Sequence, residues 1–175
     1  ITNFPYAQTI SGSVIANGTN VPDAAVLLFQ PVGNNLNPAG GAVADNSGNY
    51  QISAAPGNYV LVPFKSNFVA NESLAQVTLT AGVNLSSNLF LISADRTITG
   101  SFLDASNAAV GAPGVLVPVA SQNGFLTIAF TDTNGNFNAG VTSDQWRVEI
   151  SDQGAAFHNY LRPQNKVRVD TTAGS

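Results

Sequence analysis

The chain is built from short runs of apolar or alternating apolar and polar residues, each bounded by Gly, Pro, Asn or Asp. Such runs are typical of β-strands joined by turns, and helical periodicity is hard to find. The runs cover residues 9–16, 24–30, 50–54, 59–65, 75–80 and 88–93 in the first half, and 97–103, 115–120, 126–132, 136–139, 146–151 and 166–170 in the second. They predict an all-β fold of packed sheets, because an open sheet would leave one apolar face in water.

The two halves of the chain repeat each other. Gly12, within Ile-Ser-Gly-Ser, matches Gly100, within Ile-Thr-Gly-Ser, and residues 45–50 match residues 132–137. The shift between the halves is 88 residues at the first landmark and 87 at the second, a near-constant value that is unlikely by chance. The sequence therefore predicts two tandem modules, which occupy residues 9–95 and 96–175, preceded by a strand at residues 1–8.

Four landmarks within each module form a recognisable pattern. They are a Gly in the first strand, a Pro/Gly-Ala turn, an Asp-x-x-Gly-x-aromatic hairpin and a Pro-Gly-x-Tyr strand entry; the first module carries them at residues 12, 22–24, 45–50 and 56–59, and the second keeps the first three at residues 100, 113–114 and 132–137. The second module departs at the last landmark, where it reads Ser143-Asp144-Gln145-Trp146.

With these landmarks each module resembles the carboxypeptidase regulatory-like domain, a β-sandwich of the prealbumin (transthyretin-like) and CNA-B-like type. The resemblance implies two tandem seven-stranded Greek-key β-sandwich modules, the second without its last strand. It implies little about activity, because this kind of module accompanies peptidases, transporters, surface proteins and polysaccharide-binding proteins.

The composition narrows the function further. Charged residues make up 9% of the chain, the net charge is −4, and Lys and Arg do not cluster along the sequence, which argues against a nucleic-acid partner. The chain has no Cys and one His (His158), so we expect no catalytic residues, no metal, no cofactor and no enzyme activity. A surface of uncharged polar residues favours a secreted or cell-surface protein, and no apolar run is long enough to span a membrane.

The two Asp-x-x-Gly-x-aromatic hairpins are rich in side-chain oxygens, as calcium loops are. However, Gly stands fourth in them and each carries a single carboxylate, whereas an EF-hand loop places Gly sixth after several ligands. We therefore interpret Asp45 and Asp132 as residues that cap their own turns, and Gly48 and Gly135 as positions with positive φ.

Two modifications are suggested by short motifs. Asn17, Asn71 and Asn84 each begin an Asn-x-Ser/Thr sequon at a predicted turn, so they are possible glycosylation sites. Lys–Asn isopeptide cross-links occur in related surface modules of Gram-positive pili, but neither predicted first strand here contains a Lys. We therefore expect no such cross-link.

The repeat also predicts where a strand is missing. The first module ends with a strand at residues 89–94, which leads directly into the second module, but the second module stops a few residues after its counterpart of residues 77–79. Aligning Gly12 with Gly100 places residues 1–8 on residues 89–96, the final strand of a preceding module. The repeat thus predicts a spare final strand at residues 1–8 and a second module without its last strand.

Two arrangements explain this pattern. Either separate subunits complete one another, with Ile1, Phe4 and Tyr6 of a donor strand filling a groove edged by Val167 and Val169 of the next subunit, or the chain is one period of a longer tandem array. We expect the first, which gives a non-enzymatic filament or pilus-like structural protein that assembles head-to-tail with itself. The alternative is a carbohydrate- or partner-binding accessory module, with a surface polysaccharide as its ligand.

Overall fold

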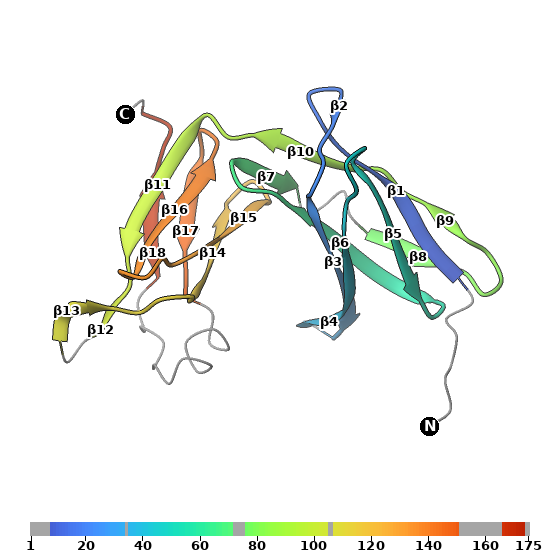
Figure 1. Ribbon diagram of the computed structural model, residues 1–175, viewed down its shortest axis with the longest axis horizontal. Coiled ribbons are helices and arrows are strands. Elements are labelled where there is room, and N and C mark those ends of the chain that lie inside the picture. Colours follow the sequence, from blue (N-terminus) through green and yellow to red (C-terminus); the bar gives the residue numbers. More distant parts are fainter. Residues whose placement is uncertain (1–7, 34, 72–75, 105–106, 151–165, 174–175) are drawn as a thin grey trace. The chain divides into compact units, whose positions relative to one another are not determined.

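The computed structural model describes residues 8–33, 35–71, 76–104, 107–150 and 166–173. Every regular element within these residues is a β-strand, so the predicted all-β class is confirmed (Figure 1). None of the elements that the structure describes is a helix with the length and apolarity needed to cross a membrane. The described residues form two compact units: residues 8–65 with 70–92, and residues 66–69 with 93–173.

The first unit consists of two sheets that enclose an apolar core. One sheet has the strand order β4 (Asn35–Val43), β3 (Ala25–Val32), β6 (Gly57–Phe64) and β8 (Gln76–Leu79). The other is centred on β1 (Gln8–Ala16), which pairs antiparallel with β5 (Asn49–Ala54) and β2 (Thr19–Asn20), and parallel with β9 (Leu85–Ser86) and β10 (Leu89–Ser93). Alternate side chains point inward, and Ile10, Val14, Val26, Leu28 and Leu61 are fully buried.

The second unit repeats this plan with fewer strands. One sheet has the order β18 (Val167–Asp170), β17 (Gln145–Val148), β14 (Leu116–Ser121) and β15 (Phe125–Phe130). The facing strands are β11 (Arg96–Ser101) paired with β16 (Asn136–Val141), and the short pair β12 (Leu103–Asp104) and β13 (Asn107–Gly111). Trp146 is buried at the centre of a core that includes Ile98, Val117, Val119 and Val141.

The departure of the second module from the Pro-Gly-x-Tyr landmark preserves a hydrogen bond. In the first unit, Tyr59 donates its hydroxyl to the carbonyl oxygen of Ala55, four residues earlier, at 2.8 Å. In the second, Trp146 donates its indole Nε1–H to the carbonyl oxygen of Thr142, also four residues earlier, at 2.9 Å. Trp146 therefore replaces Tyr59 at the equivalent position, and each aromatic side chain donates its polar hydrogen to the same kind of backbone acceptor.

Two features of the fold differ from the sequence-based expectations. Strand β4 lies over a stretch that contains Pro38, Gly40 and Gly41, residues that are depleted in strands, and it forms the edge of its sheet next to β3. Residues 66–69, which the repeat assigns to the first module, belong to the second unit. There Val69 is buried in the core and Thr127 donates its hydroxyl to the carbonyl oxygen of Phe68.

Candidate functional site

In the first unit, the outer edge of β1 is covered by residues 84–91. Thr9 and Ser13 donate their backbone N–H groups to the side-chain oxygens of Asn84 and Asn88, at 2.9 and 3.0 Å. The backbone N–H of Ser87 donates to the carbonyl oxygen of Ser11 at 2.8 Å. The backbone groups that point away from β5 are thus hydrogen-bonded, and the edge is closed.

Among the residues that the structure describes, no segment covers the equivalent edge of β11 in the second unit. The register of β11 with β16 matches that of β1 with β5, since Gly100 lies opposite Phe137 as Gly12 lies opposite Tyr50. In this register every second residue bonds to β16, so the backbone groups of Thr97, Thr99 and Ser101 face away from it. Within the part of the chain that the structure describes, β16 is the strand paired with β11, and no strand pairs with its other edge.

An apolar groove of about 230 Å³ lies beside this edge. It is lined by residues from the two facing sheets of the second unit: Ile98, Gly100, Phe102, Phe137, Val148, Ile150, Val167 and Val169. Val167 is 57% exposed, although its side chain is fully apolar. An unpaired strand edge next to an apolar groove is the arrangement that accepts an added β-strand.

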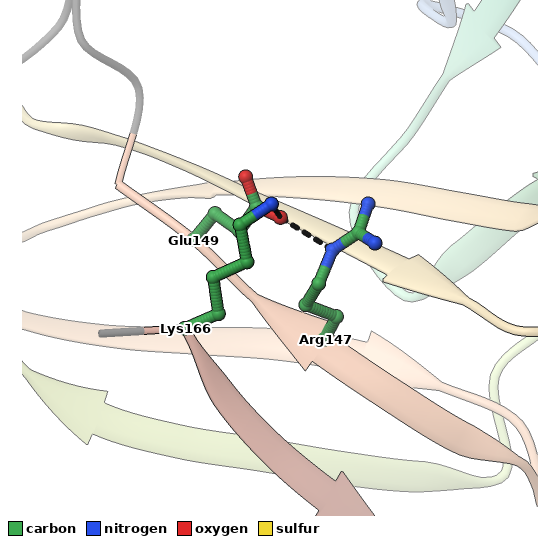
Figure 2. Close-up of polar contacts among 3 residues, drawn as sticks. All are labelled: Arg147, Glu149 and Lys166. Carbon is green, nitrogen blue, oxygen red and sulfur yellow. Dashed lines mark ion pairs between the residues drawn. The ribbon is translucent and has the colours of Figure 1, made fainter. Parts of the chain in front are cut away.

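A cluster of charged residues adjoins the groove. Glu149, which also lines it, receives both Lys166 and Arg147 on the same carboxylate oxygen, with the Lys166 Nζ at 3.1 Å. Figure 2 shows the two cations turned toward this carboxylate. Because Arg147 lies on β17 and Lys166 directly precedes β18, the cluster joins these two strands beside the groove.

The predicted acceptor residues Val167 and Val169 both lie on β18 and line the groove. The predicted donor residues Ile1, Phe4 and Tyr6 lie outside the described residues. The first unit nevertheless shows which positions of a covering strand point inward, since Leu89 and Leu91 of β10 are 3% and 4% exposed.

The register of a donor strand decides which of its side chains enter the groove. Ile92 of β10 is 41% exposed, so the alignment of residues 1–8 with 89–96 places Phe4 on an outward-facing position. The same alignment places Ile1 and Asn3 on the inward-facing positions of Leu89 and Leu91. In the first unit, however, β10 pairs with residues 14–16, whereas residues 84–88 cover Thr9, Ser11 and Ser13. A donor strand that covers the equivalent edge of β11 must therefore bind about five residues out of this alignment, and an odd shift also turns Phe4 and Tyr6 toward the groove.

The hairpin residues make equivalent turns in the two units. Asp45 accepts hydrogen bonds from the backbone N–H groups of Ser47 and Asn49, at 2.8 and 2.9 Å. Asp132 accepts from those of Asn134 and Asn136, both at 2.8 Å. Gly48 and Gly135, the fourth residues of these hairpins, have φ values of 76° and 78°, which suit glycine.

No group of three or more His, Cys, Asp or Glu residues that could hold a metal ion occurs among the described residues. His158 lies outside them. Of the three sequon residues, Asn17 and Asn84 are exposed and Asn71 is half-buried in β7 (Phe68–Asn71).

The structure also brings together cations that are far apart in the sequence. Arg147 on β17 lies directly opposite Arg168 on β18, although 21 positions separate them. Their side chains help to line a shallow hollow of about 320 Å³, together with Gln122, Gln145 and Asp170. Sequence reasoning missed this pair because the strand register that joins the two arginines is not visible in a count of charges.

Comparisons with known proteins give no assignment. No protein-family model matches the chain, and no curated protein matches it. Among solved structures, it is similar to the Bacillus anthracis TIE protein (TM-score 0.42, 11% identity) and to a streptococcal ancillary pilin (0.44, 10%). It is also similar to the shaft pilin SpaA from Lactobacillus rhamnosus GG (0.35, 8%).

Each similarity covers 93% of this chain. It covers 31% of the TIE protein, 58% of the ancillary pilin and 93% of the shaft pilin. The chain therefore spans less than two thirds of the first two proteins. Because all three TM-scores are below 0.5, function has to be argued from the residues of this chain.

Proposed function

We propose that the chain is a non-catalytic structural protein of the cell surface that assembles end to end with copies of itself. Residues 1–8 of one copy add as a strand along β11 of the next. The observation that supports this is the contrast between two equivalent strand edges. The outer edge of β1 is covered by residues 84–91, whereas the edge of β11 that faces away from β16 borders an apolar groove and pairs with no strand among the described residues.

The first unit also indicates the direction of the added strand. Strands β9 and β10 run parallel to β1, and β10 is followed directly by β11, the first strand of the second unit. Residues 1–8 stand in the same position relative to β1, so a parallel donor strand would lead into the first unit of its own copy. Such a contact joins two different surfaces and propagates as a filament.

Backbone hydrogen bonds and buried apolar side chains would both contribute to the free energy of binding of the added strand. Thr97, Thr99 and Ser101 present backbone groups that can form ladder hydrogen bonds, each contributing about 1 kcal/mol. Two apolar donor side chains buried in the groove would contribute about 2 kcal/mol each. Part of this is offset by the entropy lost in ordering residues 1–8 and in association.

Two variants test the proposal by separating donor from acceptor. Deleting residues 1–8 removes the donor, and Thr99→Pro removes an N–H that faces away from β16 and so spares the β11–β16 ladder. We expect each variant alone to stay monomeric and an equimolar mixture to give dimers, because one has only an acceptor and the other only a donor. Thr99→Val, which keeps the N–H, is the matched control and should assemble normally.

The measurement is the size distribution by light scattering and electron microscopy. The proposal fails if the truncated chain or the Thr99→Pro variant forms filaments as the unaltered chain does.

A second candidate function, binding of an acidic polysaccharide, is favoured by the opposed Arg147 and Arg168. Like charges directly opposite each other destabilise a sheet. Glu149 already pairs with Arg147, and a bound anion would relieve the repulsion that remains between the two arginines. Affinity electrophoresis through a gel that contains a polyuronate should retard the protein, whereas a neutral glucan should not. Loss of the retardation in Arg168→Gln would support this candidate, and equal migration in both gels would exclude it.

A further inference from the structure

Tyr50 and Phe137 occupy equivalent positions but have different surroundings. Each lies directly opposite the glycine of the first strand of its unit, Gly12 or Gly100. Tyr50 is 3% exposed, and its hydroxyl donates to the carbonyl oxygen of Ser87 at 2.7 Å. Phe137 is half-buried, has no hydroxyl and lines the groove.

The space beside each glycine is filled by a different group. A Cβ on Gly12 would lie 1.9 Å from the carbonyl oxygen of Ser87, so the covering backbone passes directly over this glycine. A Cβ on Gly100 would lie 2.7 Å from Cε1 and Cζ of Phe137. The ring of Phe137 is thus where the second unit would need room for a covering backbone.

We infer that Phe137 occupies the place of the donor strand while the groove is empty, and that it turns aside when residues 1–8 of a second copy bind. This inference rests on the proposed function. Phe137 then determines which strand can bind, because the donor must present a close-packed backbone beside Gly100, as Ser87 does beside Gly12. Once displaced, the ring becomes a wall of the filled groove, as Tyr50 is in the first unit.

The first unit suggests a variant that should improve the joint. Phe137→Tyr adds the hydroxyl that Tyr50 uses to bond the carbonyl oxygen of Ser87, so it offers the bound strand one more hydrogen bond. One such bond tightens binding by a factor of about two to ten. Gly100→Ala has the opposite effect, because its methyl group stands where the donor backbone must pass.

The test measures the subunit concentration at half-assembly for the full-length chain and its variants. We expect Phe137→Tyr to lower this concentration about two- to tenfold. We expect Gly100→Ala to raise it at least tenfold, while Tyr50→Phe, the matched change in the first unit, should leave it unchanged. The fluorescence of the buried Trp146 checks the folding of the two variants in the second unit, and far-ultraviolet circular dichroism checks that of Tyr50→Phe.

The outcomes separate this inference from the proposed function. If Phe137→Tyr assembles at the concentration of the unaltered chain while deletion of residues 1–8 abolishes assembly, strand addition stands and the role of Phe137 is overturned. If the deletion and Thr99→Pro both assemble normally, the proposed function fails and this inference fails with it.

Discussion

The two first-strand glycines should respond very differently to the same substitution. Gly12→Ala would place a methyl group 1.9 Å from the oxygen and 2.6 Å from the carbon of the Ser87 carbonyl, so backbone has to move. Gly100→Ala would place it 2.7 Å from the edge of the Phe137 ring, which can rotate within the groove that it lines. We therefore expect Gly12→Ala to unfold the first unit more easily and Gly100→Ala to have little effect on the second.

The magnitudes follow from the contacts. Overpacking typically costs about 1–3 kcal/mol. Displacing Ser87 and Asn88 also weakens the hydrogen bonds that they accept from Tyr50 and Ser13, each worth about 1 kcal/mol. Replacing glycine by alanine within a strand stabilises the folded state by about 0.5–1 kcal/mol, because alanine loses less conformational entropy on folding. The net loss for Gly12→Ala is about 2–4 kcal/mol, whereas that for Gly100→Ala stays within about 1 kcal/mol of zero.

Urea unfolding can assign these changes to the two units. Trp146 is the single tryptophan of the chain and lies in the core of the second unit, so its fluorescence follows that unit alone. Far-ultraviolet circular dichroism follows both units. Gly12→Ala should shift the dichroism transition and leave the fluorescence midpoint unchanged. The reasoning is refuted if Gly100→Ala lowers the fluorescence midpoint by as much as Gly12→Ala lowers the dichroism midpoint.

Three further predictions concern the hairpins, alkaline pH and cross-linking. Asp45→Ala and Asp132→Ala each remove an acceptor of two backbone N–H groups, so urea unfolding should show each unit destabilised by about 1–2 kcal/mol. Burial raises the pKa of Tyr50 from its ordinary value of 10 to about 12. The stability that its neutral form contributes is present below pH 10 and is lost as the pH rises toward 12, so Tyr50→Phe should flatten the dichroism-monitored decline in that range. Lys65 and Lys166 lie near Asp23 and Glu149 and neither is on β1 or β11, so the intact mass should equal the sequence mass; a mass lower by one ammonia would contradict this.

The sequence predicted the parts of the fold that depend on local alternation. Tyr50, Ile52 and Ala54 alternate with polar residues, and in β5 they are the buried positions. Strand β4 was not predicted, because its Pro and Gly residues disfavour a strand locally. Its pairing with β3 stabilises the strand in the folded protein. Strand β7 was not predicted, because residues 66–69 pack with the second unit whereas the residues on either side of them belong to the first.

The acceptor edge could be predicted only in part, and the reason lies in how far its determinants are spread along the chain. The repeat predicted an acceptor groove edged by Val167 and Val169, and both side chains line the groove beside β11. It could not show that Tyr50 and Phe137, which look interchangeable as aromatic residues, have different roles. The neighbour that distinguishes them is Ser87, 37 positions from Tyr50, whose carbonyl group lies against Gly12, whereas the ring of Phe137 lies against Gly100. A tandem repeat therefore predicts equivalent strands, but the packing of each copy depends on which segments complete it, and here that difference turns one of two similar sandwiches into a candidate joint between subunits.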